Sequence, residues 1–150
     1  MEKSTTRATA NRRSKSTLSA VLIFVVTFAV AFFATKLIFS KDPVDAELKK
    51  AAEEMNKNLP VQVDSITRLD KTEAFEGGKI QYNYTLTGIA KGDSTINIEE
   101  TKKLLVEQSE ATLFADPKME SFRKNKVEMK YVYKDKNGQF LFDFTVKPKK

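Results

Sequence analysis

The side chains that could carry catalysis in this chain are serines, lysines and carboxylates, because the sequence contains no histidine and no cysteine. Without those two residue types, a Ser-His-Asp triad, a Cys-His dyad and the commonest zinc sites cannot be assembled from this chain alone. One nucleophilic arrangement remains, in which a lysine amine activates a serine hydroxyl. The candidate serines for such a dyad are Ser65, Ser94, Ser109 and Ser121. None of them lies in a recognisable catalytic motif.

Paired carboxylates are the second chemical option, since Glu99 and Glu100 are adjacent in the sequence. On a helix, neighbouring residues point about 100° apart, so these two carboxylates are poorly placed to work together. The sequence also has no Gly-rich phosphate loop. We therefore expect no catalytic residue, no metal and no cofactor. A membrane-anchored hydrolase that uses a Ser-Lys dyad or carboxylates is the alternative.

A stripe of alternating aromatic residues offers a binding site rather than a catalytic one. It comprises Tyr82, Tyr84, Tyr131, Tyr133, Phe140, Phe142 and Phe144. Such a stripe could line a groove for an apolar ligand or an extended peptide, which would make the domain a sensor of apolar molecules. Aromatic residues at every second position are also what the buried face of a sheet requires. We expect a core, with the tyrosine hydroxyls at its rim, where they can reach water.

The opposite face of the predicted strands is polar except for four aliphatic residues. If the two hairpins described below are neighbours, these residues could merge into one exposed apolar patch for a protein partner. Scattered surface aliphatics are common and provide the competing explanation. The four residues of this predicted partner patch are Ile66, Ile89, Val132 and Leu141.

The positive charge of the chain is confined to its N-terminal part. The net charge is +6, and residues 1–41 carry seven Lys and Arg against one acid. Residues 42–150 carry nineteen residues of each sign. A folded domain without net positive charge has no electrostatic basis for binding DNA or RNA, so no nucleic-acid partner is expected.

A run of twenty uncharged, mostly apolar residues from Ser16 to Thr35 has the length of a membrane span, and the apolar character continues to residue 39. Basic residues before the run favour a cytoplasmic N-terminus. We therefore expect a disordered basic cytoplasmic tail at 1–15, a transmembrane helix at 16–39 in the bacterial inner membrane, and an extracytoplasmic domain at 42–150. Cleavage after Ala31, in a small-x-small sequence, is the alternative.

Hydrophobic periodicity predicts helix, hairpin, helix, hairpin within the domain. Helices are expected over 43–58, after an Asn97 cap, and briefly from Asp116. One hairpin should pair 61–75 with 79–91, placing Phe75 opposite Ile80, and the other should place Tyr133 opposite Phe140. The expected fold is α+β, in the order α-β-β-α-β-β, with helices on one face of a four-stranded antiparallel sheet.

Three segments carry a resemblance, namely 63–70, 82–86 and 131–138. They resemble a group of small exported or membrane-anchored bacterial envelope proteins of uncharacterised function. The resemblance implies an envelope setting and brings no activity. The function expected is that of an envelope protein whose outward domain binds a protein partner, either as an accessory of a secretion or surface machine or as an inhibitor or immunity factor.

Overall fold

The structure, a computed structural model, describes residues 43–149. The predicted tail at 1–15 and the predicted transmembrane helix at 16–39 lie outside the described residues. Within 43–149, the helices are too short or too polar to cross a bilayer. The single span in our predicted fold class therefore finds no counterpart in the part of the chain that the structure describes.

The helices begin and end close to the predicted positions. Helix α2 spans Val44–Asn56, α3 spans Ile98–Ala115, and α4 spans Glu120–Lys124 after a 3-10 turn η1 at Pro117–Met119. The side chain of Asn97 accepts the N–H of Glu100, which satisfies one donor at the start of α3. These caps and turn residues are local signals, and so they were readable from the sequence.

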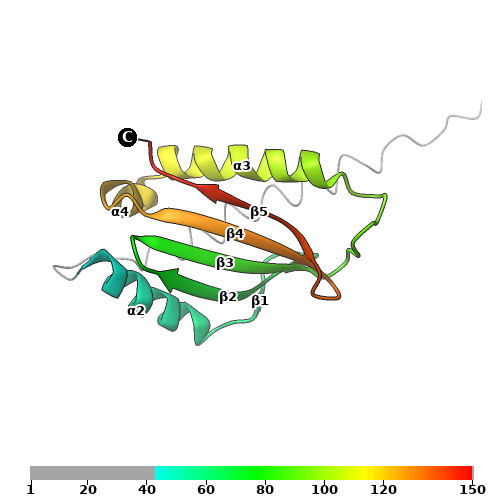
Figure 1. Cartoon of the computed structure of the whole chain (residues 1–150), viewed down its shortest axis with the longest axis horizontal. Coiled ribbons are helices and arrows are strands. Elements are labelled where there is room, and N and C mark those ends of the chain that lie inside the picture. Colours follow the sequence, from blue (N-terminus) through cyan, green and yellow to red (C-terminus); the bar gives the residue numbers. More distant parts are fainter. Residues whose placement is uncertain (1–42, 150) are drawn as a thin grey trace, which may run out of the picture.

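The sheet differs from the predicted one in both strand number and direction (Figure 1). It has five strands in the order β1-β2-β3-β4-β5, and β3 pairs with β4 in parallel. The prediction of a four-stranded antiparallel sheet was wrong. The chain leaves β3, passes through α3, η1 and α4, and returns to the end of the sheet where β3 began, so β4 runs in the same direction. The strand bounds are β1 Val61–Gln62, β2 Thr67–Phe75, β3 Lys79–Leu86, β4 Glu128–Asp135 and β5 Phe140–Val146.

The additional strand arises because the predicted strand 61–75 is interrupted at Asp64. The carboxylate of Asp64 accepts the N–H groups of Ile66 and Thr67, both at 2.7 Å, and this bends the chain back on itself. Strand β1 then pairs with β2 in antiparallel fashion. The polar turn residue within an otherwise alternating segment was the signal for this break.

Both predicted registers were wrong, and each ladder also contains an irregularity. Ala74, rather than Phe75, lies opposite Ile80, and the β2–β3 ladder shifts again between Leu69 and Lys71. In the second hairpin, Tyr133 lies opposite Phe142. That displacement is two residues, so the predicted faces of Tyr133 and Phe142 are retained. The ladder is irregular between Tyr133 and Lys134, however, so Phe140 lies opposite Lys134 and is exposed instead of inward.

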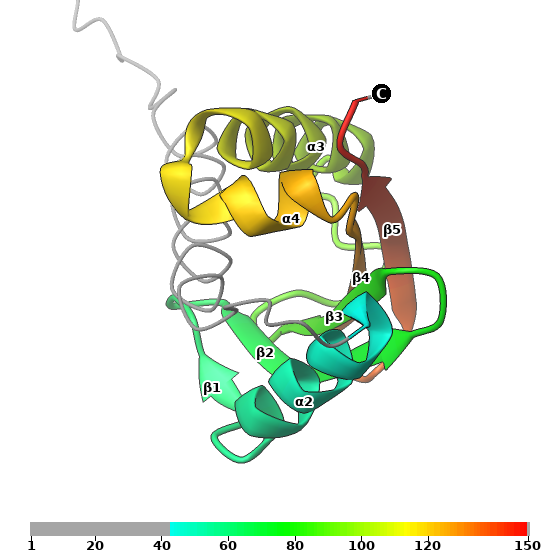
Figure 2. The same ribbon diagram turned by 90° about the vertical axis from the view of Figure 1, so that its left-hand side faces the viewer.

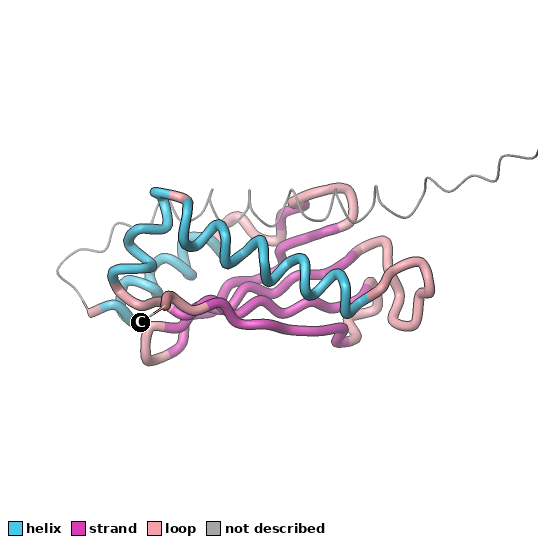
Figure 3. Tube along the Cα trace, turned by 90° about the horizontal axis from the view of Figure 1, so that it is seen from above, coloured by secondary structure: helices cyan, strands magenta, loops and turns pink. Residues whose placement is uncertain are grey.

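One face of the sheet packs against the helices and forms the core (Figures 2 and 3). Tyrosine and phenylalanine rings stack across neighbouring strands there, with ring centroids 5.0 Å apart for Tyr84 and Tyr133 and 4.7 Å for Tyr133 and Phe142. Leu48 of α2 and Leu105 of α3 belong to the same buried cluster. The expectation that the aromatic stripe is core is confirmed for every member except Phe140, which is 50 % exposed.

The tyrosine hydroxyls lie deeper than predicted. All four tyrosines are at most 1 % exposed, so their hydroxyls are not at a wet rim. Those of Tyr84 and Tyr133 have no hydrogen-bond partner. Burial raises the pKa of both far above the ordinary value of 10.0, because the charged phenolate would lose its hydration. The core is therefore aromatic and contains polar atoms that contribute nothing through hydrogen bonding.

Candidate interaction surface

The face of the sheet that points away from the helices is here called the open face. Four strands contribute alternate, mostly polar side chains to it, because successive residues of a strand point to opposite sides. No helix within residues 43–149 packs on this face. Its residues include Arg68, Lys71, Glu73, Gln81, Asn83, Thr85, Lys130, Val132, Lys134 and Asp143.

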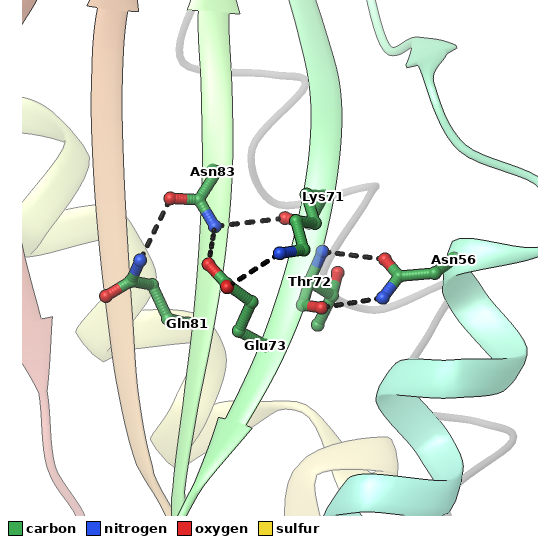
Figure 4. A network of polar contacts seen from close by, with 6 residues as sticks. All are labelled: Asn56, Lys71, Thr72, Glu73, Gln81 and Asn83. Atoms are coloured by element: carbon green, nitrogen blue, oxygen red, sulfur yellow. Dashed lines mark hydrogen bonds and ion pairs between the residues drawn. The ribbon is translucent and has the colours of Figure 1, made fainter.

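A chain of polar contacts crosses the open face from β2 to β3 (Figure 4). Lys71 Nζ lies 2.8 Å from Glu73 Oε1, and the amide of Asn83 donates to the other Glu73 oxygen at 3.0 Å. Gln81 donates in turn to Asn83 Oδ1 at 2.9 Å. The Lys71 ammonium, followed by Asn83 and the more distant Lys134, lowers the pKa of Glu73 against the opposing effect of its partial burial. This glutamate is therefore held ionised and cannot serve as a proton donor near neutral pH.

The remaining charges on the open face are largely neutralised in pairs. Arg68 bonds Asp70, whose second oxygen accepts the hydroxyl of Thr85. Lys130 lies 3.2 Å from Asp143 on the neighbouring strand. Because such pairs are solvent-exposed, they add little stability. They do leave the face without a strong field of either sign, which suits a protein surface better than a nucleic acid or an anionic ligand.

At one end of the open face is a hollow of about 380 Å³ beside the turn between β2 and β3. Phe75 forms an apolar wall and is 49 % exposed, an unusual position for a large aromatic side chain. Two lysines and two glutamates surround it, so the hollow combines an apolar wall with groups of both signs. The lining residues are Phe75, Glu76, Lys79, Gln81, Glu128, Lys130 and Thr145. This hollow was not predicted from the sequence, because the alternation of 61–75 places Phe75 among the inward positions of its strand.

The four residues of the predicted partner patch do not share one exposed surface. Ile89 is 4 % exposed and belongs to the core cluster, and Val132 is 9 % exposed. Ile66 and Leu141 are half-buried against the core. Ile66 lies just before β2 and Ile89 shortly after β3, whereas Val132 lies on β4 and Leu141 on β5. The use of these residues by a partner stays a prediction.

The residues considered for catalysis are not assembled into a site. Ser109 is buried in α3, and its hydroxyl has no hydrogen-bond partner. Across residues 43–149, no lysine donates a hydrogen bond to Ser65, Ser94, Ser109 or Ser121. Glu99 and Glu100 are exposed in the first turn of α3. The described residues also contain no group of three acidic side chains that could hold a metal ion.

Solved structures with a similar fold include two type II secretion pilotins and one protein described as secreted, all from bacteria. The pilotin EpsS of the Vibrio vulnificus type 2 secretion system superposes with a TM-score of 0.53 at 14 % identity, covering 69 % of this chain and 86 % of the pilotin. The type II secretion pilotin AspS of Vibrio cholerae gives 0.51 at 14 % identity, covering 79 % and 94 %. A Pseudomonas aeruginosa protein described as secreted gives 0.51 at 12 % identity, covering 71 % and 95 %. At these identities the likeness establishes a shared fold.

Sequence comparison places the chain in a family without bringing an activity. No curated protein matches it. Residues 43–142, which include every helix and strand from α2 to β4 and the start of β5, match the model described as a domain of unknown function, DUF8479. The chain therefore belongs to the DUF8479 family.

Proposed function

We propose that this domain is a non-catalytic binding module of the bacterial cell envelope, acting as an accessory of a secretion or surface machine. The likeness of its fold to two type II secretion pilotins supports the kind of machine. The printed descriptions of these pilotins mention a secretion system and no reaction. The absence of histidine and cysteine from this chain agrees with a role in binding.

The single observation that carries the proposal is the open face with the hollow at Phe75. A half-exposed aromatic side chain in a concave, charge-balanced surface is the kind of anchor that protein interfaces use. The paired charges around it can form the polar rim of an interface without leaving an uncompensated charge on binding. A protein partner would insert an apolar side chain beside Phe75 and cover part of β2, β3 and β4.

The test is site-specific photo-crosslinking of the full-length chain in the bacterium that encodes it. A benzoylphenylalanine in place of Phe75 should give one discrete adduct, which mass spectrometry identifies. The matched control carries the same group in place of Phe114, which lies on α3 and is 38 % exposed. Absence of an adduct at position 75, or equal adducts at both positions, would contradict the proposal.

A further inference from the structure

The turn between β4 and β5 contains a chemically labile pair of residues. Asn137 is the only asparagine in the sequence that is followed by a glycine. Both residues are exposed, and beyond the chain neighbours nothing lies within 4 Å of the position that a Cβ of Gly138 would occupy. Because a glycine has no side chain to obstruct it, its backbone nitrogen can approach the side chain of the preceding asparagine. This pair is therefore the place in the chain where an asparagine amide is most open to attack.

The carboxylate of Asp135 fastens this turn from its buried side. It accepts the N–H groups of Asn137 and Gln139, both at 2.8 Å, and that of Lys91, at 2.9 Å, from the segment after β3 (Figure 1). The backbone carbonyl of Asp135 accepts the N–H of Gly138 at 3.0 Å. The nitrogen that would attack Asn137 is thus engaged in a hydrogen bond, which must break before the nitrogen can react.

The side chain of Asn137 is held by the same residue. Burial raises the pKa of Asp135, but the backbone donors and the Asn137 side chain outweigh this effect and lower the pKa. An amide that donates to this carboxylate points back along the chain, away from the nitrogen of Gly138. Asp135 therefore keeps the two reacting groups apart as long as the turn is closed.

We propose that Asn137 is a deamidation site that Asp135 keeps closed. When the turn opens, the backbone nitrogen of Gly138 attacks Cγ of Asn137 and passes its proton to the solvent. The bond between Cγ and Nδ2 breaks, ammonia leaves, and a succinimide ring remains. A water molecule then opens the ring and gives aspartate or isoaspartate at position 137, and no group is oxidised or reduced.

The product of this reaction cannot restore the closed turn. Its carboxylate at position 137 lies beside that of Asp135, so two like charges replace the contact between amide and carboxylate. Isoaspartate also lengthens the backbone of the turn by one carbon atom. The modification is therefore a permanent record that the turn has opened, and it depends on no partner.

The experiment incubates the purified full-length chain in detergent micelles near neutral pH and measures deamidation at each asparagine by peptide mass spectrometry. The folded chain should react at position 137 at least about tenfold more slowly than the same chain unfolded in guanidinium chloride, because the closed turn must first open. Far-UV circular dichroism checks that the folded sample stays folded. Equal rates in the two samples, or no reaction at position 137 in the unfolded chain, would overturn the proposal.

The variant Asp135→Ala removes the fastening, and Asp64→Ala is the matched control, because the Asp64 carboxylate accepts two backbone N–H groups in a different turn, between β1 and β2. In the folded state, Asp135→Ala should accelerate the reaction at position 137 by about tenfold, since the turn loses a charged acceptor. Asp64→Ala should leave that rate unchanged. An unchanged rate in Asp135→Ala, or equal acceleration by both variants, would show that Asp135 does not control the reaction. If either alanine variant fails to fold, Asp135→Asn and Asp64→Asn, which retain the size of the side chain, give the same comparison with a smaller acceleration.

Discussion

Ile89 lies just after β3, and its side chain is 4 % exposed within the core cluster. An aspartate at this position would bury a carboxylate without a partner, so Ile89→Asp should lower the free energy of unfolding by more than about 3 kcal/mol. Phe140→Asp is the matched control, because Phe140 is half-exposed, and it should change stability by less than about 1 kcal/mol. Urea unfolding measures both. A folded Ile89→Asp variant of parent stability would show that Ile89 is a surface residue after all.

Asp135 shows how a single side chain can organise two loops. Its carboxylate accepts the N–H of Lys91 from the segment after β3 and those of Asn137 and Gln139 from the β4–β5 turn. Burial opposes its ionisation, but these three donors outweigh that effect and hold the pKa of Asp135 below the ordinary 3.8. The stability that it contributes is therefore complete above about pH 4 and is lost as the pH falls further.

At the scale of elements, the contact between α2 and the edge of β2 gives a direct test. Asn56→Ala removes both hydrogen bonds to Thr72 and leaves a partly buried N–H and C=O without partners. We expect this variant to be less stable by about 1–3 kcal/mol. Asn58→Ala, at an exposed position just after α2, should stay within about 0.5 kcal/mol of the parent. Equal effects of the two substitutions in urea unfolding would refute the role assigned to Asn56.

The elements that the sequence analysis predicted correctly are those determined by short-range signals. Asn97 caps a helix, and the alternation of tyrosines in β3 and β4 places them on the core face. Whether β3 and β4 pair in parallel or antiparallel depends on the end of the sheet to which the chain returns after α3. No local sequence pattern determines that end. A helix inserted between two strands is typical of parallel pairing, and this sequence of elements was the available signal.

The candidate site was harder to predict than the fold. The position of Phe75 depends on a one-residue register difference at the end of β2, which moves a side chain from one face of the sheet to the other. The position of β5 at the edge of the sheet depends on the order of the strands. Both features follow from the tertiary arrangement, whereas the absence of His and Cys, which excludes a Ser-His-Asp triad or a Cys-His dyad built from this chain alone, was already visible in the composition.

At the scale of the whole molecule, the burial of all four tyrosines predicts how the protein responds to alkali. Their pKa values are raised by burial, so the neutral forms are favoured in the folded state. This contribution to stability is fully present below the ordinary pKa of 10.0 and is lost as the pH rises above it. Tyrosinate absorbance should therefore appear together with the loss of far-UV circular dichroism, because the chain contains no other tyrosine.

The variant Tyr133→Phe provides the matched comparison for this titration. The Tyr133 hydroxyl has no hydrogen-bond partner, so its removal should leave stability near pH 7 unchanged or slightly higher. Above pH 10 the variant should lose stability less steeply than the parent. Tyrosinate signal that precedes unfolding in the parent would mean that at least one of the four rings is accessible to solvent.

The parallel pairing of β3 with β4 has a consequence for biosynthesis. Forty-one residues separate Leu86 from Glu128, so β2 and β3 leave the ribosome well before β4. During that interval the nascent hairpin exposes an unsatisfied strand together with Tyr82 and Tyr84, a combination prone to misassociation. A nascent chain with this topology is a natural client for a chaperone that shields aromatic surfaces until synthesis is complete.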